Sequence, residues 1–187
     1  MTVHYGPAMT EVSIRRYDPG DHDGVRRTVS AAFHPGNEAD LVELIRDSDQ
    51  YVAEMELVAV VGDGVVGHVI ISGATIVDET GVASPVAMLS PLAVDPTRQR
   101  QGIGGALVEA VCAIAERRGE PMIVLEGSPT YYSRFGFEPS ASVGITLPLP
   151  DWAPPEAAQV LRLGVYDPSD PRLRGTVRYP PAFEGFE

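Results

Sequence analysis

The sequence has few of the residues that mark secreted, metal-binding or membrane proteins. Cys112 is its one cysteine, which excludes an intramolecular disulfide and leaves no thiol cluster for a metal. No apolar run approaches the roughly 20 residues that a membrane helix needs. The N-terminal residues lack the basic-then-apolar order of a signal peptide. We therefore expect a cytoplasmic protein with no metal and no membrane partner.

Positive charge is also scarce. Fourteen basic residues stand against 26 acidic ones, for a net charge of −12. Such a chain has no general attraction to nucleic acid or to an anionic membrane, so neither is expected as a partner. An anionic ligand would need a local basic site, for which Arg98 and Arg100 are candidates, with Arg134 as a third. A cationic amine would suit the acidic remainder.

The composition is that of an ordinary globular protein. Hydrophobic residues make up 44% and charged residues 21% of 187 residues, which is enough to bury a sizeable core. We expect a single domain over residues 1–187. Its core would span about residues 11–147, and residues 148–187 would add a strand and an irregular tail.

Hydrophobic spacing and turn residues predict strands alternating with helices, and therefore a mixed α/β sandwich. Gly62-Asp63-Gly64 is typical of a hairpin turn, and Pro91 should interrupt the pairing of its strand. The expected strands are Val12–Arg16, Tyr51–Val61, Val65–Val77, Val86–Val94, Met122–Leu125, one near Val143–Leu147 and one near Val160–Val165. The expected helices are Asp21–Phe33, Asn37–Asp47, Gly102–Arg118 and Pro129–Phe135.

The segment Leu92–Leu107 is a strand end, a polar loop and a glycine-rich helix start. The first turn of a helix leaves backbone N–H groups unpaired and favours negative charge. Gly102, Gly104 and Gly105 carry no side chain that would hold a phosphate at a distance. Arg100 and Gln101 add donors, so the segment favours a diphosphate over the alternative that its glycines only allow close helix packing.

A dinucleotide-binding fingerprint is the competing interpretation. It requires G-x-G-x-x-G directly after a strand, with an acidic residue about 20 residues further on. Glu126 imitates the acid, but Leu107 occupies the position of the third glycine. A long polar loop also separates Val94 from Gly102. The sequence therefore does not favour a dinucleotide fold.

Gln99, Gly102 and Gly104 match the pattern Q/R-x-x-G-x-G/A, the acyl-CoA-binding motif of the GCN5-related N-acetyltransferases (GNAT). The run Ser128–Phe137 is similar to the tyrosine-bearing helix and the following Gly-Phe of that family. The chain resembles this family over most of its length, and the tail Gly175–Phe183 is similar to its YhbS-like bacterial branch. The resemblance is weakest before Tyr51, where acceptor-binding elements usually lie.

The resemblance implies the GNAT fold, a mixed twisted sheet flanked by helices with acetyl-CoA between two splayed parallel strands, here Val86–Val94 and Met122–Leu125. Backbone groups of the first strand would meet the pantetheine and thioester, and the loop and helix start would hold the pyrophosphate. The implied cofactor-binding residues are Leu92, Ala93, Val94, Gln99, Arg100, Gln101, Gly102, Ile103, Gly104 and Gly105.

The resemblance also implies two catalytic residues. Tyr132 matches the tyrosine that protonates the leaving thiolate, although a packing role for it, or for Tyr131 beside it, remains open. Glu126 matches the general base of ribosomal-protein N-terminal acetyltransferases, and a solvated or helix-capping carboxylate is the alternative. His68 is expected as a hydrogen-bonded strand histidine, with a place in the lining of the acceptor site as the alternative. Ser90 is a candidate for ordering a water near the thioester.

The expected function is therefore acetyl-CoA-dependent N-acetylation, by direct attack, of a primary amine on a small molecule or a protein N-terminus. A non-catalytic acyl-CoA-binding sensor is the alternative, because the loop reports only cofactor capture. The acceptor amine is not identified by any residue type. A homodimer is an assembly that such folds allow.

Overall fold

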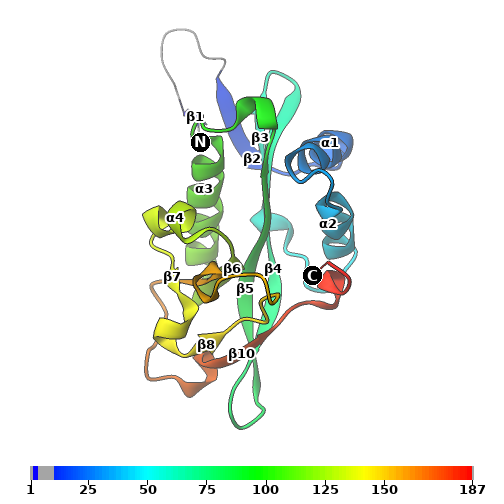
Figure 1. Cartoon of the computed structure of the whole chain (residues 1–187). Helices are drawn as coiled ribbons and strands as arrows, with labels where there is room; N and C mark the ends of the chain where they lie inside the picture. Colours follow the sequence, from blue (N-terminus) through cyan, green and yellow to red (C-terminus); the bar gives the residue numbers. More distant parts are fainter. Residues whose placement is uncertain (1, 4–10, 187) are drawn as a thin grey trace. The chain divides into compact units, whose positions relative to one another are not determined.

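The computed structural model describes residues 2–3 and 11–186 (Figure 1). These residues form a mixed β-sheet with helices beside it, in two compact units. The first unit holds the described residues up to Ile71, together with Pro91–Ile114 and Phe186, and the second holds Ser72–Ser90 and Ala115–Gly185. Among the described residues, none of the helices has both the length and the apolar composition of a membrane span.

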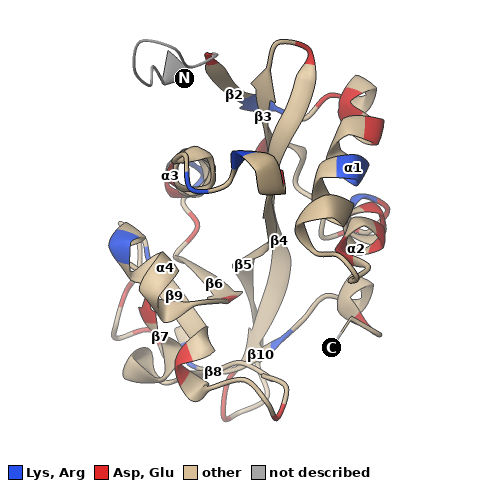
Figure 2. Cartoon of the chain, turned by 45° about the horizontal axis from the view of Figure 1, so that its top comes forward, with Lys and Arg blue, Asp and Glu red and all other residues tan. Residues whose placement is uncertain are grey.

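The first unit is built on an antiparallel ladder of β1 (Thr2–Val3), β2 (Val12–Arg16), β3 (Glu56–Val61) and the first half of β4 (Gly64–Val77). Helices α1 (His22–Ala32) and α2 (Glu38–Arg46) share a core with Val58 and Val60 of β3. A Cβ on Gly67 would lie 2.9 Å from Leu107 of α3 (Ile103–Arg118). Because neighbouring strand residues point to opposite faces, α3 covers the face opposite α1 and α2 (Figure 2).

The second unit contains strands in the order β4 (its second half), β5 (Ala83–Val94), β6 (Met122–Glu126), β9 (Ala158–Arg162) and β7 (Glu138–Pro139). Strand β10 (Gly175–Arg178) pairs with β4 and with β8 (Ile145–Thr146). Helix α4 (Pro129–Tyr132) follows β6. The buried core of this unit consists of Ala74, Ile76, Val86, Met88, Met122, Val124, Ile145, Leu147, Ala158, Val160, Leu173 and Val177.

Short 3₁₀ helices complete the chain: η1 (Pro19–Asp21), η2 (Ala53–Met55), η3 (Pro96–Arg98), η4 (Ser133–Phe135), η5 (Ser140–Val143), η6 (Pro155–Ala157), η7 (Pro171–Leu173) and η8 (Pro181–Phe183). Most of them begin with or directly follow a proline, whose fixed φ suits a first helical position. The proline-rich parts of the sequence therefore form short 3₁₀ turns between longer elements.

Strands β5 and β6 are parallel, as expected for the pair that would flank the cofactor. Their ladder joins Ala87 to Ile123 and Met88 to Val124. In the part of the chain that the structure describes, this ladder ends before Pro91, although β5 itself continues to Val94. The ladder is therefore short compared with the length of β5.

Most predicted elements are confirmed within a few residues, and three predictions need correction. The strand expected from Tyr51 begins at Glu56, because Ala53–Met55 form η2. The strand expected near Val143–Leu147 is only Ile145–Thr146, since η5 ends at a left-handed Gly144. The tail, expected to be irregular, contains β10.

Candidate functional site

The polar loop before α3 is held by hydrogen bonds within the first unit. The backbone N–H of Asp95 donates to the carbonyl of Val66 on β4, at 2.9 Å. The Asp95 carboxylate accepts from the backbone N–H of Thr97 at 2.8 Å and from its hydroxyl at 2.7 Å. These bonds cap η3 and fix the direction in which the chain leaves β5.

The two glutamine side chains of this loop bond to the loop itself. Gln99 Nε2 donates to the carbonyl of Val94 at 3.2 Å, and Gln101 Nε2 donates to the carbonyl of Thr97 at 3.4 Å. The sequence interpretation treated Gln101 as a donor for the ligand. In the structure its side-chain amide bonds to the loop, and its role as a donor to the ligand stays a prediction.

The backbone turns sharply just before α3. Arg100 has a φ of 59°, and among the described residues no other non-glycine has a positive φ. Gly102 has a φ of 86°, and α3 begins at the next residue, Ile103. A non-glycine residue in the left-handed backbone conformation is strained, and such residues are found most often where function requires them. Left-handed residues just before a helix turn nearby backbone N–H groups toward one point, and such an arrangement suits an anion.

The arginines supply the local positive charge that the acidic chain otherwise lacks. Arg98 is half-buried at the end of η3 and Arg100 is exposed, and Figure 2 shows basic residues on the segment that leads into α3. With the helix N-terminus and Gly102, these residues have the donors and the space that a diphosphate needs. The loop therefore fits the phosphate end of a CoA-type molecule.

The second unit carries the two predicted catalytic residues. Glu126 is the last residue of β6, is half-buried, and has its pKa raised above the usual value by burial. Its Oε1 accepts a hydrogen bond from the hydroxyl of Tyr179. A carboxylate in a partly desolvated position holds a proton more readily than one in water, which suits general-base chemistry.

Tyr132 lies close to the residue that follows Glu126. A Cβ on Gly127 would collide with the Tyr132 ring, whose Cδ2 would be 2.9 Å away. The carbonyl of Gly127 accepts from the Nε2 of Gln159 on β9 at 3.0 Å. The missing side chain at position 127 therefore lets the tyrosine pack against the end of β6, and Gln159 holds that end in place.

Tyr131 and Tyr132 have different surroundings, which the sequence could not assign. The Tyr132 ring packs edge-on against the buried Phe137, with centroids 5.6 Å apart. The Tyr131 ring lies under the guanidinium of Arg134, at 4.3 Å, and near Phe135. Arg134 thus contacts Tyr131 within the second unit, whereas Arg98 and Arg100 belong to the loop itself.

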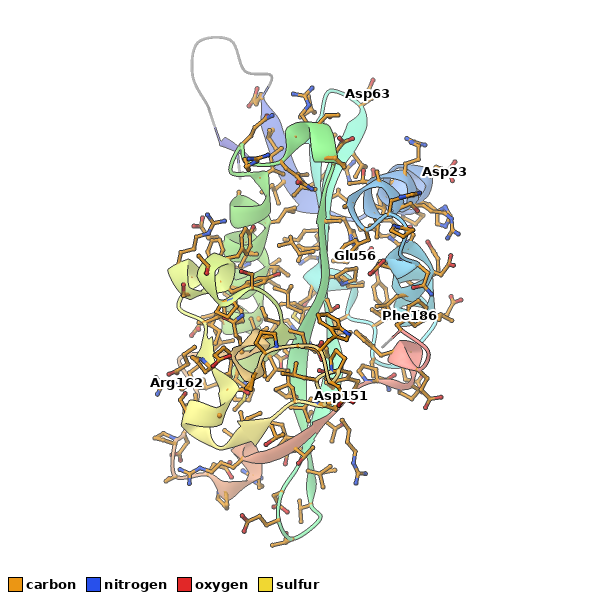
Figure 3. All side chains as sticks on the ribbon, in the orientation of Figure 1. Asp23, Glu56, Asp63, Asp151, Arg162 and Phe186 are labelled. Atoms are coloured by element: carbon orange, nitrogen blue, oxygen red, sulfur yellow. The ribbon has the colours of Figure 1, made fainter. Side chains whose placement is uncertain are left out.

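A second cluster of ionisable groups, buried in the first unit, was not anticipated from the sequence. Glu56, labelled in Figure 3, has no exposed surface and accepts from Arg46 Nε at 3.0 Å and from the Tyr51 hydroxyl at 2.7 Å. His68 Nε2 lies 2.8 Å from the same carboxylate. The Arg46 guanidinium also lies 3.9 Å from the Tyr17 ring centroid. His68 is therefore the hydrogen-bonded strand histidine that was expected.

The remaining sequence candidates have plain structural positions. Ser90 is half-buried on β5, and Cys112 lies in α3, where burial raises the pKa of its thiol to about 12. Such a thiol is un-ionised at neutral pH and is a poor nucleophile. In the ranges that the structure describes, no group of three His, Cys, Asp or Glu side chains could hold a metal ion.

Sequence reasoning missed Tyr179, which lies in the tail. The available signal was the run Tyr179-Pro180-Pro181-Ala182-Phe183, whose two aromatic side chains favour a packed segment. Glu56 and Arg46 were also missed, because the buried state of a single glutamate in a strand cannot be recognised from its neighbours in the sequence.

Comparison with known proteins identifies the class to which these features belong. A family model described as an acetyltransferase (GNAT) domain matches residues 13–140. The N-acetyltransferase YjhQ of Escherichia coli K12 is 32% identical over 142 residues, 75% of this chain and 74% of that protein. The N-acetyltransferase YhbS of the same strain is 34% identical over 129 residues, 68% of this chain and 74% of YhbS.

Two solved structures extend the comparison to the fold. YhbS from Escherichia coli in complex with CoA matches with a TM-score of 0.80 and 30% identity, over 99% of this chain and 98% of that one. A GNAT acetyltransferase from Brucella melitensis in complex with acetyl-CoA matches with a TM-score of 0.73 and 29% identity, over 94% and 99%. The chain therefore belongs to the GNAT family, and its class of activity is that of an N-acetyltransferase.

Proposed function

We propose that this protein transfers an acetyl group from acetyl-CoA to a primary amine by direct attack, with Glu126 as the general base and Tyr132 as the proton donor. The observation that carries the proposal is the half-buried Glu126 carboxylate, with its raised pKa, beside a glycine against which Tyr132 packs. The related structures with CoA and acetyl-CoA support the choice of co-substrate.

Each residue would have a separate task. The backbone groups of Arg100–Gly105, with the side chains of Arg98 and Arg100, would hold the pyrophosphate, and the backbone of Leu92–Val94 would orient the acyl arm. Acetyl-CoA supplies the acetyl group as an activated thioester. As the acceptor nitrogen forms its bond to the carbonyl carbon and the C–S bond breaks, Glu126 takes the nitrogen's proton and the Tyr132 hydroxyl protonates the sulfur.

The test of this function is CoA release, measured as free thiol, with acetyl-CoA and a panel of polyamines, amino acids, aminoglycosides and peptides with free N-termini. We expect at least one amine to raise thiol release well above the rate without acceptor. The sequence contains no lysine, so acetyl-lysine found by mass spectrometry in a protein acceptor cannot come from the enzyme itself. Stabilisation by CoA with no amine-dependent thiol release would instead support the sensor function.

Gly102→Ala should weaken acetyl-CoA use. An alanine at this left-handed position costs about 1–2 kcal/mol, so the loop will prefer a conformation whose N–H groups no longer converge. We expect the KM for acetyl-CoA to rise about tenfold, since 1.4 kcal/mol corresponds to a factor of ten. Steady-state kinetics at saturating acceptor measure the effect.

Gly62→Ala is the matched control for that prediction. Gly62 also has a positive φ, of 57°, and a Cβ there would meet no atom within 4 Å. Gly62 lies in the hairpin between β3 and β4. The Gly62→Ala variant should therefore lose a similar amount of stability while its KM for acetyl-CoA stays unchanged. Equal KM values in the two variants would contradict the role of the loop.

A further inference from the structure

We propose that Tyr179 of the C-terminal tail is a positioning residue, which holds the Glu126 carboxylate in the orientation that accepts the proton of the amine. The inference rests on the proposed function of Glu126 as the base. It assigns the tail a part in the chemistry, although Tyr179 and Glu126 are separated by more than a quarter of the chain in sequence.

The contact itself defines the role. The Tyr179 hydroxyl donates to Oε1 of Glu126, and both residues are half-buried. A carboxylate can accept at both oxygens, so a donor on Oε1 fixes the plane of the group while Oε2 remains able to accept a proton. Without the phenol, the carboxylate would rotate about its last side-chain bond, because terminal torsions of this type are broad.

The position of Tyr179 is set by strand pairing. In β10, Thr176 pairs with Val77, Val177 with Ile76 and Arg178 with Thr75. Val177 is 1% exposed within the core of the second unit. Tyr179 directly follows Arg178, the last paired residue of β10, so its backbone can move only if this ladder shifts.

A glycine fixes the register of that ladder. Gly175 has a φ of 128°, and a Cβ there would collide with the carbonyl of Val77, whose carbon would be 2.8 Å away. Only glycine allows β10 to begin so close to β4. The tail is therefore held at one register, as a positioning residue requires.

The residues after Tyr179 secure its ring from the other side. Pro180 and Ala182 are buried, and the ring of Phe183 lies 5.7 Å from the ring of Tyr179. Both aromatic rings pack against the buried core of the second unit. The tyrosine is thus anchored by its ring as well as its backbone, and its hydroxyl is the one part that reaches the carboxylate.

The groups around Glu126 give the expected effect a definite sign. In the second unit, the Tyr179 hydroxyl bonds to Glu126 itself. The ring of Tyr132 and the amide of Gln159 contact the next residue, Gly127. Burial raises the pKa of Glu126. A hydroxyl that donates to the charged carboxylate acts in the opposite direction, so its removal should raise that pKa further.

The experiment compares the full-length wild type with Tyr179→Phe and with Tyr166→Phe. Tyr166 is a half-buried tyrosine packed against the same core, so it controls for the loss of a hydroxyl. NMR titration of the side-chain carboxyl carbons, with the Glu126 signal assigned by its loss in Glu126→Gln, gives the pKa directly. We expect it to rise by about one pH unit in Tyr179→Phe and to be unchanged in Tyr166→Phe. Equal values in all three proteins would overturn the inference.

The activity measurement separates this inference from the proposed function. With a weakly basic acceptor, which stays unprotonated over the range, the acidic limb of kcat/KM reports the base of the enzyme. We expect this limb to move upward with the Glu126 pKa in Tyr179→Phe. If the NMR pKa moves and the limb does not, Glu126 is not the base and the proposed mechanism fails. If Glu126→Gln removes the limb but Tyr179→Phe changes neither quantity, only the role of Tyr179 fails.

Discussion

Replacing Glu56 by glutamine should lower the free energy of unfolding by about 3 kcal/mol, the scale on which a broken buried ion pair destabilises a protein. The change keeps the size of the side chain and removes its charge. Among the described residues, Arg46, whose side chain is 10% exposed, would then keep only Glu43, at 3.0 Å, as an anionic partner. Urea denaturation followed by circular dichroism measures the loss.

The reason lies in how the cluster is satisfied. Glu56 is fully buried, and Arg46, Tyr51 and His68 all bond to its carboxylate. Burial pushes the pKa of Glu56 upward, but the bonds from His68 and Arg46 outweigh it, and the pKa lies below its usual value. The glutamate is therefore charged in the folded protein, and from its strand it neutralises the Arg46 guanidinium.

Two variants complete the test of this cluster. Asp40→Asn removes a short but exposed ion pair, Arg26 to Asp40 at 2.6 Å, and should cost less than about 1 kcal/mol. The double variant Arg46→Met with Glu56→Leu should lose less than the sum of the two single changes, since no buried charge is left unpaired. If Glu56→Gln lost no more unfolding free energy than Asp40→Asn does, the prediction would be contradicted.

The same cluster predicts loss of stability in acid. Burial lowers the pKa of His68 below its ordinary 6.5, against the opposing pull of Glu56. As the pH drops through 6.5, His68 binds a proton in the unfolded state but not in the folded state. The free energy of unfolding therefore falls as the pH drops through that value. Glu56, with a lowered pKa, adds a further loss at more acidic pH. In Glu56→Gln this second loss should disappear.

Glu126→Gln should reduce kcat by about 100-fold or more, since general-base catalysis contributes 10²–10⁴ in rate. The amide has the same shape, so packing at the end of β6 is preserved, but it cannot take a proton from the amine. In the wild type, kcat/KM should fall at low pH as Glu126 becomes protonated. That limb should be absent in the variant when a weakly basic acceptor is used.

The matched control for this rate prediction is Glu138→Gln. Glu138 is also a half-buried glutamate of the second unit, on β7, and it pairs with Arg162 at 2.6 Å. It should keep the kcat and the acidic limb of the wild type. An intact low-pH limb in Glu126→Gln would remove Glu126 from the mechanism, and unchanged turnover in Tyr132→Phe would remove the tyrosine.

Local rules were sufficient for the parts of the fold that depend on neighbouring residues. The hairpin at Gly62–Gly64, the end of α3 at the left-handed Gly119 and the stop at Gly136 follow from the conformational freedom of glycine. The start of α3 followed from glycines after a polar loop, which is also why the phosphate-binding segment could be predicted. Family resemblance then supplied the roles of Glu126 and Tyr132, which remain predictions.

What the sequence could not determine was which distant residues meet. By itself it determined the class of fold, the loop before α3 and the family, because these depend on spacing along the chain. Only the tertiary structure joined Tyr179 to Glu126, since a tail residue reaches β6 through the pairing of β10 with β4. It also gathered Arg46, Glu56 and His68 into one buried cluster, because a charge enters a core only when partners from other elements meet it there.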